Sequence, residues 1–446
     1  MRGEPPRPSS RAVAVLALVW VFAVATLPST VGCGATGTRE RLAAATGSRD
    51  VEAALRAYEG LRDERSDPDL EALQRIAAIV LEAEVMRTDE LRDRVFDGLI
   101  GTGSASQDLL ERLARRGGMV GLRAMAALAA QGDLDYDDRL RLALGAQEGE
   151  ARAAGMESLR EADAELPTLT RLSSDPEPDV RAKAATRLAA TAPDVAALLV
   201  LGECVRLDPE ADVRATCARA LGRFGREGAE RLRERLADPD ARVRRAVAWS
   251  LGMADGEVAA AALAGLLSSA PTAEGIEGAR ALAIRGDAGA RAYLRTALAA
   301  GSPEVRGHAA LALLALSDDG DLDVARLIGE RLGAETDEGL KVLLAEALLR
   351  REQDHAESLR ILRAAVASSS APSHLHASGV LVRRGDAAAR RALDAATREG
   401  SSTRRASAIR LLAFDARGAD AIRRFLLDPD ERVRLTAALA MFRAES

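Results

Sequence analysis

The chain has 446 residues, of which 2% are aromatic and 29% are charged, and its formal net charge is −6. So few aromatic side chains exclude a large aromatic-rich core, whereas many Ala and Leu residues suit small seams between stacked helices. The first 32 residues carry three Arg and one Glu, which leaves −8 on the remainder. An acidic chain of this kind is not expected to bind nucleic acid, which needs clustered basic side chains.

The N-terminal segment has the pattern of an export signal. Three arginines within the first eleven residues precede an uncharged run over residues 12–27, which Pro28 ends. This run is short for a membrane-spanning helix, which needs about 20 residues, and it matches the apolar region of a secretory signal. We therefore expect a signal peptide over residues 1–32 and the bulk of the chain outside the cytoplasm.

Cys33 follows the sequence Thr30-Val31-Gly32 and is the candidate for lipid attachment. These residues resemble the lipobox of bacterial lipoproteins, in which small residues precede a Cys that is acylated, although Thr30 stands where Leu is usual. The resemblance implies a lipid anchor at Cys33 and a short linker over residues 33–38. It also implies a location in the bacterial cell envelope, facing the periplasm or the cell exterior. Two alternatives stay open, an ordinary cleaved signal and an uncleaved short anchor, with Cys33 incidental in both.

A short motif recurs through the rest of the chain. The five strong copies are Val180-Arg181, Val213-Arg214, Val243-Arg244, Val305-Arg306 and Val433-Arg434. Weaker copies fall at Leu91-Arg92, Leu122-Arg123, Ala151-Arg152, Ile276, Leu340, Leu375 and Arg404-Arg405. About a dozen repeats of roughly 30 residues are typical of a solenoid.

Each strong copy reads as the start of a helix. Four follow an Asp-Pro pair and the fifth follows Ser302-Pro303; we expect the Asp or Ser to cap the helix and the Pro to fill its first position. Counting from the Val, position +4 is small, position +5 is always Ala, and position +8 is Leu or Met. Positions 0, +4 and +8 share one helical face. A second helix, such as residues 228–236, follows each first helix.

This pattern resembles HEAT repeats of the short bacterial type first grouped with phycobilisome lyases. The match is strongest over residues 175–260 and 428–446. The resemblance implies an all-α fold, a right-handed α-α superhelix of about a dozen helix pairs over residues 85–446, with residues 39–84 as a helical N-terminal cap that includes atypical repeats. In that family the Arg of the motif can pair with an Asp of a neighbouring repeat. We therefore expect the five motif arginines to be structural.

No pattern in the chain indicates chemistry. The four His residues and the remaining Cys and carboxylates match no known metal-ligand spacing. No phosphate loop, nucleophile elbow or pair of catalytic carboxylates stands out. We predict no catalytic, cofactor-binding or metal-binding residues and no cofactor.

Three further residues carry specific expectations. Cys204 and Cys217 could form a disulfide in an oxidising compartment. We favour the alternative of two small, unbonded, buried side chains, because disulfide geometry is restrictive and Cys217 occupies a small +4 position. Trp249, at position +6, should be partly exposed on an outer face formed by the first helices. It could anchor a partner, although a contact with a neighbouring loop is the favoured interpretation.

These features together predict a membrane-tethered, extracytoplasmic scaffold that binds a protein partner in the cell envelope and is not an enzyme. The partner should bind the inner face, which we expect the second helices to form. Two other functions stay open. The family resemblance implies a lyase-type enzyme acting on a tetrapyrrole, and the repeat architecture alone would also suit a purely structural envelope spacer.

Overall fold

The computed structural model describes residues 33–446, apart from residues 64–67, 160–164, 255, 268–269, 318–321, 352–354, 370–371, 415 and 445–446. The predicted signal peptide, residues 1–32, lies outside these described residues. Every regular element of the described chain is a helix, which confirms the predicted fold class. None of the helices in this part of the chain has both the length and the apolar character of a membrane span.

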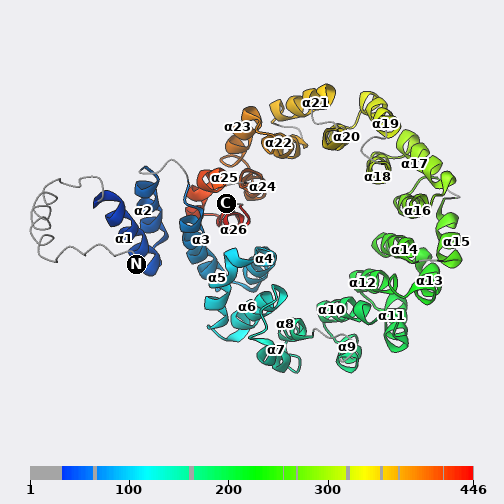
Figure 1. The fold of residues 1–446 in the computed structure, drawn as a ribbon, viewed down its shortest axis with the longest axis horizontal. Coiled ribbons are helices and arrows are strands. Elements are labelled where there is room, and N and C mark those ends of the chain that lie inside the picture. Colours follow the sequence, from blue (N-terminus) through cyan, green and yellow to red (C-terminus); the bar gives the residue numbers. More distant parts are fainter. Residues whose placement is uncertain are drawn as a thin grey trace, which may run out of the picture.

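Two helices at the N-terminal end, α1 (Cys33–Gly47) and α2 (Val51–Asp63), pack on each other. They lie outside the ring that the later helices form (Figure 1). The residues predicted as a linker, 33–38, belong to α1. The predicted cap, residues 39–84, includes most of α1, all of α2 and also α3 (Leu70–Glu84), which is part of the ring.

From α3 to α26 the helices alternate between an outer and an inner circle of a closed ring, and no described element crosses its middle (Figure 1). After α3, the outer helices are α5 (Ser104–Ala114), α7 (Asp137–Ala143), α9 (Leu166–Leu172), α11 (Val195–Leu207), α13 (Gly225–Arg233), α15 (Glu257–Leu266), α17 (Ala288–Ala300), α19 (Leu322–Ala334), α21 (Ala356–Ala367), α23 (Ala387–Ala396) and α25 (Ala416–Ile422).

The inner helices are α4 (Asp89–Leu99), α6 (Gly118–Ala130), α8 (Gly149–Gly155), α10 (Pro178–Leu188), α12 (Ala211–Leu221), α14 (Ala241–Met253), α16 (Ala273–Ile284), α18 (Pro303–Ala315), α20 (Glu338–Arg351), α22 (His374–Val382), α24 (Ser402–Leu412) and α26 (Glu431–Arg443). The ring thus holds twelve helix pairs, as the repeat count predicts. Four short 3-10 segments, η1 (Met156–Ser158), η2 (Ala189–Thr191), η3 (Glu234–Ala237) and η4 (Arg423–Leu427), extend helix ends.

The helices that begin with the Val-Arg motif form the inner circle, so the expectation that they lie outside was wrong. The Ala at position +5 is buried in all five strong copies. Consecutive inner helices pack directly on one another, as α12 does on α14 and α14 on α16, whereas neighbouring outer helices contact each other much less. Small side chains allow this close approach and shorten the inner row. The solenoid therefore curves toward the helices that carry the smallest interface residues.

The Asp of each Asp-Pro pair has a different role from the predicted helix cap. Asp175 accepts a hydrogen bond from the backbone N–H of Glu177, and α10 begins only at Pro178. Asp208, Asp238 and Asp428 likewise precede their helices by several residues and accept from the N–H two residues on. Ser302 alone among the five caps its helix directly, by accepting from the N–H of Val305.

The Asp side chains instead receive the motif arginine of the preceding repeat. Arg181 donates through Nε and Nη2 to the two carboxylate oxygens of Asp208, at 2.7 and 2.9 Å, and through Nη1 to the carbonyl oxygen of Asp175 at 2.9 Å. Each such arginine thus joins its own turn to the next repeat. Corresponding pairs are Arg152–Asp175, Arg214–Asp238, Arg244–Glu274, Arg306–Glu335 and Arg405–Asp428. The predicted pairing between repeats is confirmed, with Glu replacing Asp in some repeats.

An arginine–carboxylate pair of the same kind joins the last repeat to the first and so closes the ring. Nε and Nη2 of Arg434, on α26, donate to Oε1 of Glu84 at 2.8 and 2.6 Å. Glu84 ends α3, at the point where the acidic partner follows the outer helix in other repeats. Because α26 also packs on α3 and α4, the first outer helix takes the place of the next repeat after the last one.

The place where the two ends of the chain meet, which we call the seam, contains a shared hydrophobic core. One continuous cluster of buried side chains includes Tyr58 and Phe96 from the N-terminal helices together with Ile422 and Met441 from the C-terminal helices. The hydroxyl of Tyr58 donates to Asp420 at 3.2 Å, and Nε2 of Gln74 donates to the carbonyl oxygen of Met441 at 3.2 Å. The two ends of the chain therefore form one folded unit.

A cavity at the seam should weaken both ends of the chain. We expect Met441→Ala to lower the free energy of unfolding by about 2–5 kcal/mol and to raise amide hydrogen exchange in α3 and α4 as well as in α26. The matched control is Leu313→Ala, because Leu313 occupies the same +8 position on α18 and is also buried. It should raise exchange around α18 and leave α3 protected. Unchanged exchange of α3 in Met441→Ala would contradict closure.

Acid should weaken the arginine pairs. Burial raises the pKa of Glu335, but hydrogen bonds from Arg306, from the N–H groups of Asp337 and Thr336, and from Arg331 lower it to about 2, below its usual 4.5. Since the folded pKa is depressed, the stabilisation is present above pH 4.5 and is lost as the pH falls toward 2.

We expect the melting temperature of the wild type to fall across this pH range and that of Glu335→Gln to fall less, from a lower starting value at neutral pH. Glu304→Gln, which changes an exposed residue of α18, should keep the wild-type pH dependence. Equal pH dependence in all three proteins, measured by thermal denaturation, would count against a role for Glu335.

Candidate functional site

The inner helices turn one regular set of positions toward the middle of the ring. Positions 0, +4, +5 and +8 are buried in the strong copies, so positions +3, +6 and +10 lie on the side of each helix that is turned away from this buried face. We call the side chains at +3, +6 and +10 of the inner helices the inner surface. In three weaker copies the pattern of buried residues shifts the start of the repeat. Position 0 then lies two residues before the predicted Leu122, Ile276 and Leu375, at Val120, Glu274 and Ser373.

Five exposed apolar side chains follow one another along four consecutive inner helices. They are Trp249 and Met253 on α14, Ile284 on α16, Leu311 on α18 and Leu343 on α20. Their exposed fractions range from 38% for Trp249 to 68% for Ile284. We call them the apolar track. Contiguous apolar side chains at a protein surface usually mark a contact with another molecule.

The inner surface is basic although the chain is acidic. Its described positions hold ten basic side chains, Arg94, Arg123, Lys183, Arg219, Arg223, Arg280, Arg350, Arg383, Arg410 and Arg443, and four acidic ones, Asp97, Glu157, Glu277 and Glu346. This is a net charge of +6, against −6 for the whole chain. The acidic excess must therefore lie elsewhere, which leaves the middle of the ring favourable for negative charge.

Each acidic side chain of the inner surface already has a basic partner. Glu157 pairs with Arg187 and Lys183, and Glu277 pairs with Arg280. Asp97 lies 3.9 Å from Arg123. By contrast, half of the basic side chains form no ion pair with any described residue: Arg94, Arg219, Arg223, Arg410 and Arg443.

Glu346 is the centre of the most highly connected charged group on this surface. His376 Nε2 lies 2.6 Å from Glu346 Oε2, and Arg350 donates to Oε1 at 2.8 Å. Hydrogen bonding from His376 lowers the pKa of Glu346, burial raises it and Arg350 lowers it further, to about 2. Arg383 lies 3.8 Å away and also faces the ring of Phe414, 5.3 Å from its centroid. This group links α20 to α22.

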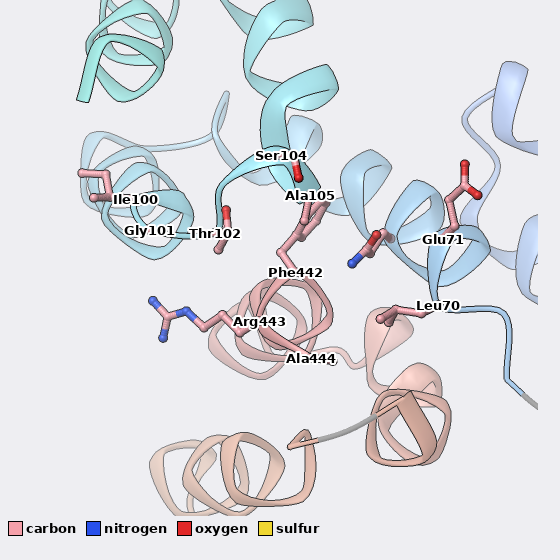
Figure 2. Close-up of a pocket in the computed structure, with 11 residues that line it drawn as sticks. Leu70, Glu71, Ile100, Gly101, Thr102, Ser104, Ala105, Phe442, Arg443 and Ala444 are labelled. Atoms are coloured by element: carbon pink, nitrogen blue, oxygen red, sulfur yellow. The ribbon is translucent and has the colours of Figure 1, made fainter. Parts of the chain in front are cut away.

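Two hollows flank the seam. The first, of about 730 Å³, lies between the start of α3, the α4–α5 connection and the end of α26. Figure 2 shows Phe442 at the end of α26, Ala105 at the start of α5 and Leu70 at the start of α3 lining it, with the Arg443 guanidinium directed away from Leu70 and Glu71. The second, of about 600 Å³, opens between the inner helices α4, α24 and α26. We call this second hollow the seam pocket.

The seam pocket combines positive charge with an apolar lining. Arg94, Arg410 and Arg443 line it together with a single carboxylate, that of Asp97. Phe414, Leu435 and Leu439 supply apolar surface between them. Of the three guanidinium groups, that of Arg443 donates to the carbonyl oxygen of Gly98 at 3.1 Å and that of Arg410 to the hydroxyl of Ser407 at 3.1 Å. None of these pocket arginines was singled out from the sequence, where each is one Arg among many in a helix.

The predicted contact residue Trp249 is exposed, but on the inner surface rather than on an outer face. The reason is the direction of curvature, since α14 is an inner helix. Cys33, the predicted lipid attachment residue, is the first residue of α1. Its lipidation stays a prediction. No group of three or more His, Cys, Asp or Glu side chains within the described residues is placed to share a metal ion.

Cys204 and Cys217 are joined by a disulfide, with their Cα atoms 6.1 Å apart. The favoured interpretation of two unbonded side chains therefore differs from the structure. Cys217 is buried at position +4 of α12, as expected, but Cys204 is only half-buried on α11. The bond ties an outer helix to the inner helix that follows it.

Removal of this disulfide should lower stability without loss of fold. For a loop of this length we expect Cys204→Ser/Cys217→Ala to lower the free energy of unfolding by about 3 kcal/mol. Ala already occupies position +4 in other repeats, so the packing should persist. Denaturant titration measures the change, and the reduced wild type is the control that should match the variant. A protein purified under oxidising conditions in which both thiols react with an alkylating reagent would contradict the bond.

Comparisons with known proteins identify part of the chain as HEAT repeats. The family model described as HEAT repeats matches residues 198–279. No curated protein matches the chain. Among solved structures, one similar chain is human deoxyhypusine hydroxylase in complex with glycerol, at 19% identity, over 63% of the present chain and 97% of that chain, with a TM-score of 0.24. A likeness this distant says nothing of what the present chain binds. The chain therefore contains HEAT repeats over residues 198–279, within a solenoid of paired helices.

Proposed function

We propose that the chain is a membrane-tethered, extracytoplasmic scaffold that binds a protein partner on the inner surface of its ring and catalyses no reaction. HEAT repeats generally mediate contacts between proteins. The apolar track is the observation that carries this proposal, because it places five exposed apolar side chains in succession on the face that a ring offers to a bound molecule.

The location in the cell envelope rests on the N-terminal sequence. The basic segment, the uncharged run and Cys33 fit a lipoprotein signal. A disulfide between Cys204 and Cys217 fits an oxidising compartment, since such bonds are rare in the cytoplasm. The envelope location and the lipid anchor are thus parts of one proposal, which one purification can test.

The test is affinity capture of the tagged full chain, crosslinked in its native cells, with mass spectrometry of captured proteins and of the N-terminal peptide of the chain itself. We expect a diacylated Cys33 and a dominant envelope protein. An N-terminus that begins at Met1, together with cytoplasmic proteins in the capture, would overturn the envelope location.

A matched pair of variants tests the surface. Leu311 on α18 and Leu199 on α11 are both 51% exposed, the first on the apolar track and the second on an outer helix. We expect Leu311→Ser to reduce recovery of the partner about tenfold, as loss of a well-placed anchor does, and Leu199→Ser to leave it unchanged. The reverse result would move the binding surface to the outside of the ring.

A further inference from the structure

We infer that the seam pocket binds a carboxylate side chain that stands next to an apolar side chain in an acidic segment of the partner. This inference rests on the proposed function and deepens it, because it names the chemistry of the partner. Three features of the described residues carry it: the charge of the inner surface, the cations of the pocket that lack an ionic partner, and the apolar lining between them.

The first feature is the separation of charge. Ten basic and four acidic side chains face the middle of the ring, in a chain whose net charge is −6. A neutral or basic partner would gain nothing from this arrangement. An acidic segment is attracted toward the middle of the ring and repelled from the acidic remainder of the molecule, which favours entry in one place.

The second feature is local. Arg94, Arg410 and Arg443 converge on the seam pocket from α4, α24 and α26, and none forms an ion pair with a described residue. Asp97 offsets one of the three charges, so the lining keeps a net +2. Guanidinium groups bind carboxylates through two parallel hydrogen bonds. The pocket therefore has the donors that a carboxylate needs, and α4 meets α26 there only because the ring is closed.

The third feature distinguishes an acidic polypeptide from a nucleic acid. Leu435, Leu439 and Phe414 line the pocket together with the cations, so an apolar side chain that stands next to an Asp or Glu of a peptide would find apolar contacts there. The ring of Phe414 already faces Arg383, so that face is not free to stack on a base. Asp97 at the pocket would also repel a continuous row of phosphates.

Isothermal titration calorimetry on the purified full chain in detergent tests this inference. The probes are the peptide Ac-Leu-Glu-Phe-Leu-NH2, its Gln counterpart, 4-phenylbutyrate and a short oligothymidine, each also titrated into detergent buffer alone. We expect the Glu peptide to bind at least about tenfold more tightly than the Gln peptide, as a charged hydrogen bond requires. Raised salt should weaken it.

One variant that weakens peptide binding and one that tightens it separate an effect on the pocket from damage to the fold. Arg94→Gln/Arg410→Gln should weaken binding of the Glu peptide about tenfold, whereas Arg219→Gln/Arg223→Gln, which removes two equally unpaired charges at positions +6 and +10 of another repeat, should not. Asp97→Asn removes the one carboxylate of the pocket and should tighten binding about threefold. A gain in affinity cannot arise from damage to the fold.

Four outcomes would overturn the inference. Two concern the carboxylate and the arginines: equal binding of the Glu and Gln peptides, or wild-type affinity for the Glu peptide in Arg94→Gln/Arg410→Gln. Two concern the class of ligand: tighter binding of the oligothymidine than of the Glu peptide, or binding of 4-phenylbutyrate alone, which would make the pocket a site for a small organic acid. These titrations need no natural partner. If they fail while partner recovery still depends on Leu311, only the pocket is refuted; if recovery is independent of Leu311 but the Glu peptide binds, the apolar track is refuted instead.

Discussion

Closure of the ring at the seam is the constraint on which the rest of this structure depends. An open solenoid joins each repeat only to its neighbours, and small changes in rotation between repeats accumulate into large changes of shape. Here α26 packs on α3 and α4, and Arg434 pairs with Glu84 as other motif arginines pair with the next repeat. Because the last repeat meets the first in the same register, the rotation of every repeat must sum to one full turn.

Closure also determines how the protein can be used. A ring has no free terminal repeat, so the ends that would need polar caps in an open solenoid are buried in one shared core. The inner surface then faces itself across the ring, and side chains from both ends of the chain line the same pocket. A bound segment would contact several inner helices at once, which suits a molecule that holds a partner rather than one that transforms it.

The arginines that link the repeats and the arginines of the inner surface are different residues. The arginines of the Val-Arg motif are consumed by the links between repeats and are not free to bind. Five of the arginines at +3, +6 and +10 form no ion pair with a described residue, and three of these, Arg94, Arg410 and Arg443, line the seam pocket with Phe414 and Leu439. Structural and exposed cations thus occupy different positions of the same repeat, because the first lie at the helix start near the next turn and the second lie along the exposed face.

The sequence by itself determined the helix pairs, their number and the buried +4, +5 and +8 positions, because these follow from local spacing. The pairing of Arg181 with the next repeat was expected only from the resemblance to HEAT repeats. Only the tertiary structure decided the direction of curvature, which moved Trp249 to the inside, since that depends on how closely neighbouring helices approach. Only the tertiary structure, too, brings Glu84 to Arg434, which is 350 residues away in the sequence. The same closure brings Arg94, Arg410 and Arg443 to one pocket. Ring closure is a sum of small rotations over all repeats, and no single repeat encodes that sum.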